Sequence, residues 1–161
     1  MNLPKITPPA SQELGRFIAE ALMVRTADAL IHGDFTEYQQ CFSLPTTLES
    51  FEGNRRIENH AQLRTVFDGI RQFLAVNNVT ELVRKFIEAE FLDAETLQTV
   101  HESYALNGST LIKEPIPIFS VICLVDGEWR VTRSAYALRK NDELTRVLGP
   151  TTVEERASAS A

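Results

Sequence analysis

Histidine is the first residue type to examine for acid–base chemistry, because its ordinary pKa lies close to neutral pH. Of the three histidines, His101 lies in the middle of a predicted strand. His32 and His60 lie at the ends of predicted helices, where a capping role explains them. His101 is therefore the first candidate for moving a proton, and a structural hydrogen bond is the alternative. No acids or cysteines cluster with the histidines, so the sequence predicts no metal site.

Glu88 is the second candidate for proton transfer. Strand alternation places it on one face with Glu90 and Arg84, and places Ile87 on the other face. At the open end of a pocket, two carboxylates this close could have a raised pKa that suits a general base. The alternative is that the apolar face is the inner one and that both carboxylates are solvated.

Arg133 is the candidate for binding an anionic or carbonyl group. Alternation along the last predicted strand places it on the same side as Trp129 and Val131. If Trp129 faces the interior, Arg133 does too, and a buried guanidinium is costly without a partner or a wet pocket. The alternative places Arg133 at the rim, paired with a residue of a neighbouring strand.

Aromatic residues are predicted to form one wall of a ligand site. Tyr38, Phe42 and Phe51 lie close together in the sequence, and Trp129 on the last strand is expected to join them. Core packing explains Phe42 and Phe51 equally well. The hydroxyl of Tyr38 needs a partner and could orient the carbonyl group of a ligand.

Three helices are predicted to position these side chains. Apolar residues recur at spacings of three and four over residues 11–32 and again over residues 59–77. Between these segments, Asp34 followed by Glu37 has the spacing of a helix start and predicts a short helix, which Pro45 ends.

The remainder of the chain reads as strands. A short hairpin near Gly53 precedes four long strands, predicted over residues 79–92, 97–106, 115–125 and 128–138. The sequence therefore predicts an α+β fold in which a curved antiparallel sheet wraps around about three helices and encloses a pocket.

Two motifs connect this order of elements to a known superfamily. The final hairpin, VDGEWRVTRSAYAL, is similar to an acid-Gly-x-Trp-x-Val ending, and a Gly33-Asp34 pair follows the first long helix. With these motifs, residues 11–138 resemble the nuclear transport factor 2-like superfamily, and within it the SnoaL-like group. The resemblance implies a cystatin-like cone or roll. Families of this fold include isomerases, dehydratases and polyketide cyclases, but also structural subunits and transport adaptors, so the fold does not determine the function.

The resemblance also sets expectations for the site. Enzymes of this fold typically place an Asp or His inside the cone, with Tyr, Asn or a second acid at the developing oxyanion. A His often occupies the position of Arg133, so this departure favours binding of an anionic or carbonyl group over base catalysis. Every Asp of this chain falls in a predicted helix, turn or loop, which makes an enzyme less expected.

Composition limits the partners. The net charge is -6 and the basic residues form no stripe, which argues against nucleic acid. The chain has no apolar run of membrane-spanning length and no export signal, so we expect a cytoplasmic protein without a membrane partner. Cys41 and Cys123 lie in apolar stretches and are expected to be free thiols.

A homodimer is predicted from the strand over residues 115–125, which is apolar on both faces and needs cover on both. No predicted helix remains for the outer face of the sheet. We therefore expect a second copy of the chain to cover this convex face, as also occurs across the resembling superfamily.

The domain organisation is expected to be simple. Residues 1–10 carry three prolines and are predicted to be a flexible N-terminal segment. Residues 11–140 form a single nuclear transport factor 2-like domain. Residues 141–161 form a C-terminal tail with one helical turn near residues 144–148, largely disordered after residue 149.

The leading functional hypothesis is a domain that binds a small apolar or carbonyl-containing molecule in a mostly apolar pocket, without a cofactor. An enzymatic version of this hypothesis is an isomerase, dehydratase or cyclase. In such an enzyme, His101 or Glu88 moves a proton while Tyr38 or Arg133 stabilises an enolate. The alternative is a non-catalytic dimerisation or accessory module with a filled core. A cavity of roughly 300 Å3 or more with convergent polar groups would favour the first hypothesis.

Overall fold

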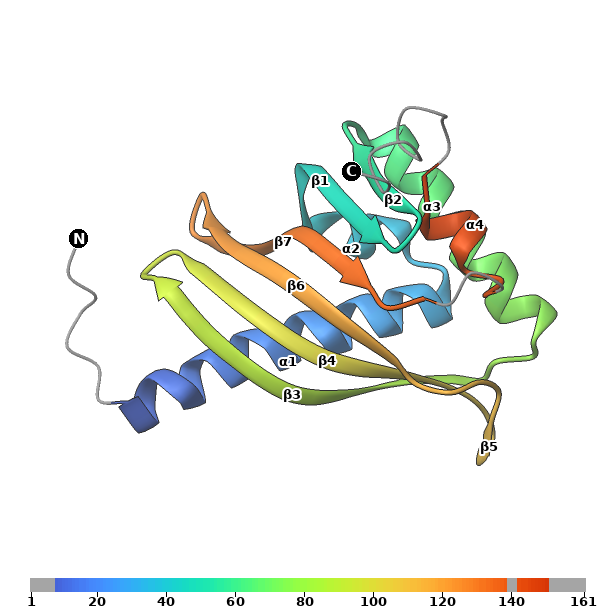
Figure 1. Ribbon diagram of the computed structural model, residues 1–161, viewed down its shortest axis with the longest axis horizontal. Coiled ribbons are helices and arrows are strands. Elements are labelled where there is room, and N and C mark those ends of the chain that lie inside the picture. Colours follow the sequence, from blue (N-terminus) through green and yellow to red (C-terminus); the bar gives the residue numbers. More distant parts are fainter. Residues whose placement is uncertain (1–7, 139–141, 151–161) are drawn as a thin grey trace.

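A computed structural model describes residues 8–138 and 142–150 of the chain. Its central element is one curved sheet of seven strands, and the long helix α1 (Pro8–His32) runs along it (Figure 1). The predicted α+β fold with a curved sheet around helices is confirmed. None of the described helices is both long and apolar enough to cross a membrane.

Shorter helices follow, with bounds and caps close to those predicted. They are α2 (Phe35–Gln40), α3 (His60–Val76) and α4 (Thr145–Leu148). The side chain of Asp34 accepts a hydrogen bond of 3.0 Å from the backbone N–H of Glu37 at the start of α2. Asn59 accepts one of 2.9 Å from the N–H of Gln62 at the start of α3. Both contacts satisfy amides that have no partner within the helix.

Two element boundaries differ from the prediction. Helix α1 begins at Pro8, inside the segment expected to be flexible, because a proline is tolerated in the first turn of a helix. Strand β1 begins at Phe42, so Pro45 lies within a strand and does not end a helix. The pairing of β1 with its neighbour is irregular between Phe42 and Thr47, where a residue without an N–H is accommodated.

The strands form a mixed sheet in the order β2-β1-β7-β6-β4-β3, with the short β5 paired to β4. Their bounds are β1 (Phe42–Ser50), β2 (Gly53–Ile57), β3 (Glu81–Asp93), β4 (Thr96–Asn107), β5 (Thr110–Leu111), β6 (Ile116–Val125) and β7 (Glu128–Tyr136). One pair departs from the antiparallel prediction, because β1 and β7 are parallel. These two strands are far apart in the sequence, so no tight turn fixes their relative direction.

A β-bulge interrupts β3. Phe86 pairs with His101 of β4, and the next paired residue, Glu88, pairs with Val100. Ile87 is therefore an extra residue, and the alternation of inner and outer side chains changes phase on passing it.

A second bulge interrupts β7. Val121 of β6 pairs with Arg133, whereas its neighbour Ile122 pairs with Val131. Thr132 is the extra residue. Side chains after Thr132 therefore point to the opposite face from that expected by counting from Trp129.

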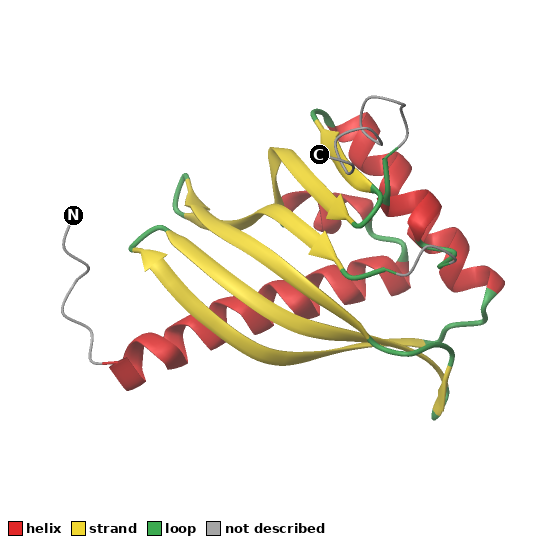
Figure 2. Ribbon diagram, in the orientation of Figure 1, coloured by secondary structure: helices red, strands yellow, loops and turns green. Residues whose placement is uncertain are grey.

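Strands β1 and β2 and helix α3 lie together at one end of the fold (Figure 2), and the buried core residues come from these elements and also from α1, β4 and β6. Aromatic rings from three elements pack there: Tyr38 lies 4.8 Å from Phe42 and 5.0 Å from Phe67, measured between ring centroids. At the other end, α1 approaches the strands closely. A Cβ at Gly15 would lie 3.3 Å from Cδ1 of Leu97, so this close approach depends on the missing side chain.

The segment around α4 packs onto the domain. The predicted helical turn is present, but Leu144 and Leu148 are buried and do not belong to a free tail. The Arg55 guanidinium donates a 2.5 Å hydrogen bond to the carbonyl oxygen of Val147, which holds α4 against β2. The rest of the predicted tail, residues 151–161, and residues 1–7 of the predicted N-terminal segment lie outside the described residues.

Candidate functional site

A cavity of about 110 Å3 lies between the concave face of the sheet and the helices. Its lining comes from all four described helices and the inner faces of the strands and is mostly apolar. The volume does not reach the roughly 300 Å3 expected for the ligand-binding hypothesis, and it is also below the ~150 Å3 of an apolar cavity that accepts benzene. The cavity therefore suits only a small ligand. The side chains in its lining with the most distinctive chemistry are Tyr38, Arg84, His101 and Tyr136.

Arg84 points from β3 into the cavity. Its Nη1 atom donates to the hydroxyl of Thr26 and, at 3.4 Å, to the carbonyl oxygen of Met23, both on α1. Its Nε atom is buried and has no hydrogen-bond partner among the described residues. Burial lowers the pKa of Arg84, but an arginine side chain remains charged in proteins. The cavity therefore holds a permanent positive charge.

His101 points into the same cavity from β4 and is 6% exposed. Neither Nδ1 nor Nε2 has a hydrogen-bond partner among the described residues. Burial, and then the charge of Arg84, lower the pKa of His101 to about 3. The imidazole is therefore neutral at physiological pH and offers the cavity one N–H donor and one acceptor nitrogen.

Two tyrosines complete the polar part of the cavity, Tyr38 from α2 and Tyr136 from β7. Burial raises the pKa of both hydroxyls, so both stay protonated and can donate hydrogen bonds. The charge of Arg84 acts on the pKa of both hydroxyls in the opposite direction, but burial outweighs it. Tyr38, Arg84, His101 and Tyr136 thus line one cavity.

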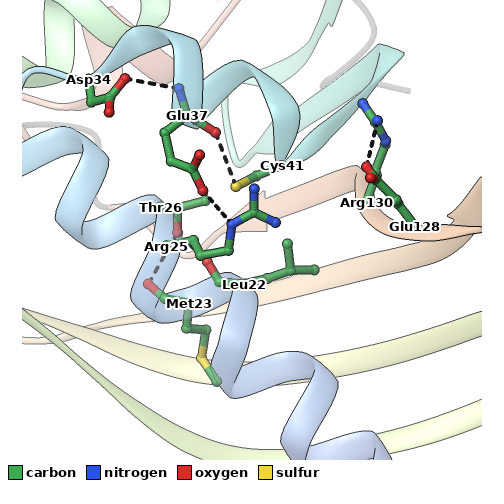
Figure 3. Close-up of polar contacts among 9 residues, drawn as sticks. All are labelled: Leu22, Met23, Arg25, Thr26, Asp34, Glu37, Cys41, Glu128 and Arg130. Atoms are coloured by element: carbon green, nitrogen blue, oxygen red, sulfur yellow. Dashed lines mark hydrogen bonds and ion pairs between the residues drawn. The ribbon is translucent and has the colours of Figure 1, made fainter.

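A polar framework between α1 and α2 positions part of this group (Figure 3). The Nε atom of Arg25 on α1 pairs with Oε1 of Glu37 on α2 at 2.6 Å, which fixes the short helix that carries Tyr38. The hydroxyl of Thr26, which receives the Arg84 hydrogen bond, donates at 2.9 Å to the carbonyl one turn earlier in α1.

Sequence reasoning missed Arg84 and Tyr136 as lining residues because of the two bulges. It placed Arg84 on one face with Glu88, but the extra residue Ile87 puts Arg84 inside and Glu88 outside. The change of phase is visible in the burial pattern: the less exposed apolar positions near Arg84 are even-numbered, Leu82 and Phe86, and further along they are odd-numbered, Ala89 and Phe91, whereas the apolar Val83 and Ile87 hide this change in the sequence itself. Such a change of phase within one strand is typical of a bulge. Tyr136 is inside for the same reason, since it follows the bulge at Thr132.

Neither Glu88 nor Arg133 points into the cavity, and for Glu88 the solvated position left open by the sequence is the one found. Glu88 is exposed on the outer face of β3 and does not line the cavity. The bulge in β7 turns Arg133 to the outer face, where its side chain is 51% exposed and pairs at 2.7 Å with Glu49 of β1. This ion pair is the alternative that sequence analysis left open for Arg133.

The aromatic candidates divide between the cavity and the surface. Tyr38 and Phe42 line the cavity. Phe51 is 72% exposed and borders a groove on the outer face of the sheet, so its expected place in the wall is wrong. Trp129 precedes the bulge in β7 and is not among the lining residues; its ring contacts that of Phe91 edge to face, with 5.9 Å between centroids.

The described residues contain no group of three or more His, Cys, Asp or Glu side chains that could hold a metal ion. Cys41 and Cys123 are both free. Burial raises the pKa of the Cys41 thiol to about 11, so this thiol is a poor nucleophile.

Solved structures share this architecture. A nuclear transport factor 2-like protein with a cystatin-like fold from Novosphingobium aromaticivorans has a TM-score of 0.60 at 14% sequence identity, over 86% of this chain and 90% of that chain. A protein of unknown function from Mycobacterium tuberculosis has a TM-score of 0.62 at 14% identity, over 98% and 90%. A proposed ketosteroid isomerase from Shewanella frigidimarina has a TM-score of 0.53 at 15% identity, over 74% and 94%.

The chain therefore has the cystatin-like cone of nuclear transport factor 2-like proteins, as the sequence resemblance implied. At these identities the likeness shows the fold alone. No protein-family model and no curated protein matches the chain.

Proposed function

We propose that the protein binds a small, mostly apolar molecule with one polar end in the cavity of the cone. The observation that carries this proposal is His101, a buried imidazole that lines the cavity while both of its nitrogens lack a partner among the described residues. Each buried polar atom without a hydrogen bond costs about 1–3 kcal/mol. A ligand with a polar end would supply these hydrogen bonds.

The distribution of side chains supports an amphipathic ligand. One part of the cavity wall is apolar and includes Leu22 of α1, Phe73 of α3 and Ile122 of β6. The polar groups around Arg84 and His101 are the part that can recognise an oxygen-containing end. A pocket with mostly apolar walls and a few converging polar groups is typical of small-molecule sites.

Binding is a better-supported function than catalysis. A general base is most effective when its pKa lies near the working pH, and the pKa of His101 is far below that. The described lining contains no Asp or Glu that could replace it. An enzymatic version, in which the His101 N–H and the Tyr38 hydroxyl stabilise an oxyanion, is the second candidate; the fold shared with a proposed ketosteroid isomerase favours it.

Isothermal titration calorimetry of the whole chain with a panel of small aromatic and branched aliphatic compounds tests the binding function. The matched variants are Ala105→Leu, which fills the cavity, and Leu111→Ala, which changes an exposed residue on β5. We expect at least one compound to bind the unmodified chain and the Leu111→Ala variant but not Ala105→Leu. Equal binding by the two variants would place the ligand outside the cavity.

We also propose that the chain acts as one domain in the cytoplasm and pairs with a second copy through the outer face of the sheet. Figure 2 shows no described helix in front of β4 and β6. The outer face carries Phe119 and Val121 of β6, and a groove of about 310 Å3 there is bordered by Phe51, Val100 and Phe119. Apolar surface of this kind is typical of protein interfaces. The free thiols support a reducing compartment.

A further inference from the structure

We infer that the polar end of the ligand is a carboxylate held by Arg84, so that the cavity is specific for small apolar monocarboxylic acids. This inference rests on the proposed binding function and adds the chemical class of the ligand. It depends on three features of the described residues: an uncompensated charge, a free edge of the guanidinium, and neighbouring groups that can all donate hydrogen bonds.

The charge of Arg84 has no counter-ion among the described residues. Both of its hydrogen-bond partners, the Thr26 hydroxyl and the Met23 carbonyl, are uncharged. The other cation of the lining, Lys113, differs in this respect, because its ammonium group pairs with Asp142. A buried charge is very costly unless an opposite charge and hydrogen bonds compensate it. An anionic ligand would compensate Arg84, whereas a neutral carbonyl compound would not.

The orientation of the guanidinium suits a carboxylate. Its two hydrogen bonds to α1 both use Nη1, and Nε is the buried atom without a partner. The edge formed by Nε and Nη2 therefore remains for a ligand. Two parallel N–H groups on one edge match the two oxygens of a carboxylate, which is the preferred bidentate geometry of arginine.

The groups around Arg84 are also suited to an anion. Burial keeps the hydroxyls of Tyr38 and Tyr136 protonated, so both can donate to an oxygen. His101 is neutral and can donate from one ring nitrogen. No described carboxylate lines the cavity to repel an anion. Several donors that line the same cavity as one permanent cation can satisfy both oxygens of a carboxylate.

The size of the cavity limits the class further. A volume of about 110 Å3 with mostly apolar walls is below the ~150 Å3 of a cavity that accepts benzene, so the body of the ligand is no larger than a benzene ring or a short branched chain. A phosphate ester would bring a larger, doubly charged group to a site with a single free cation among the described lining residues. Monocarboxylates such as benzoate and 3-methylbutanoate are therefore suitable probes.

Calorimetry on the whole chain, comparing benzoate with its neutral analogues benzamide and benzyl alcohol, tests this inference. We expect benzoate to bind about 10- to 100-fold more tightly than benzamide, the range expected for hydrogen bonds to a charged group. Arg84→Met, which keeps an unbranched side chain close in length to the aliphatic part of arginine and removes the charge, is expected to abolish this preference. Glu88→Gln, on the same strand but the outer face, is the matched control and should keep it.

A second measurement does not depend on how well a variant folds. The imidazole of His101 is followed by NMR during a pH titration of the unmodified protein, with benzoate and then with benzamide. A carboxylate next to His101 stabilises the imidazolium, so benzoate should raise its pKa and benzamide should not. A His101 pKa that benzoate does not change would overturn the inference.

The outcomes separate the two proposals. If benzamide or benzyl alcohol binds as tightly as benzoate, the carboxylate inference is wrong while the binding function stands. If none of the acids and neutral compounds binds to the unmodified protein, both proposals fail together.

Discussion

Arg84 and His101 lie diagonally across β3 and β4 on the inner face of the sheet, where Arg84 pairs with Ser103 and His101 pairs with Phe86. The charge of the guanidinium adds to burial in keeping the imidazole neutral. Each of these side chains has at least one buried nitrogen atom without a hydrogen-bond partner among the described residues. Both features are unfavourable for stability, and a ligand that relieves them gains affinity for the same reason.

Replacing His101 by Leu should stabilise the folded protein and weaken ligand binding. The substitution removes two buried nitrogens without partners and keeps a side chain of similar size, so the free energy of unfolding should rise by about 1–3 kcal/mol. Urea denaturation measures this change, and calorimetry with the best compound measures the loss of binding. A variant that is less stable but binds normally would indicate that His101 has a structural role only.

Acidic pH should destabilise the protein partly through His101. Its pKa is about 3 in the folded state and ordinarily 6.5. Between these two pH values the unfolded chain binds a proton at His101 that the folded chain does not. The free energy of unfolding therefore falls as the pH drops below 6.5, by up to about 1.4 kcal/mol per pH unit. The other ionisable groups of the cavity, Arg84, Tyr38, Tyr136 and Lys113, do not change charge in this range when unfolded.

Urea denaturation at pH 7 and pH 5 tests this dependence. The loss of stability between the two pH values should be smaller for His101→Leu than for the unmodified protein. Equal losses would show that His101 is protonated in the folded state as readily as in the unfolded chain.

Substitution of Glu88 by Gln and of Arg133 by Ala should leave the dissociation constant for the ligand unchanged within about twofold, because neither residue lines the cavity. Arg133→Ala removes an exposed ion pair with Glu49 and should cost less than about 1 kcal/mol of stability. Calorimetry and urea denaturation measure both effects. A large loss of binding in either variant would indicate that the residue points into the cavity, as strand alternation predicted.

The second copy proposed for the outer face is tested by light scattering at micromolar concentration. The unmodified chain should have twice the mass of one chain, and Phe119→Glu should reduce it to a single chain, because a charge is costly in an apolar interface. Leu111→Glu, at an exposed apolar residue on β5, is the control and should stay dimeric. A monomeric unmodified protein would rule out this assembly at that concentration.

Local signals explain which parts of the fold could be predicted from the sequence. The cap at Asn59 and the turn at Asp126-Gly127 depend on a few adjacent residues, and both occur as predicted, with φ values of 50° and 80° in the turn. The face of His101 could not be predicted in the same way, because neither face of its strand is decisively apolar in the sequence; the structure buries this side chain.

Arg84 and Arg133 could not be placed in this way, because each lies beside a bulge. The position of a bulge depends on how a strand pairs with its neighbour, and this pairing is a property of the whole sheet. One extra residue in each strand exchanges the faces of the two arginines. The site consequently contains a cation, as predicted, but from a different strand.

A crystal structure of the protein with benzoate tests the central claim most directly. The predicted result is a benzoate inside the cavity, with its carboxylate oxygens within hydrogen-bonding distance of Nε of Arg84 and of a ring nitrogen of His101. A benzoate bound in the groove beside Phe51, or a cavity without benzoate at a saturating concentration, would contradict it.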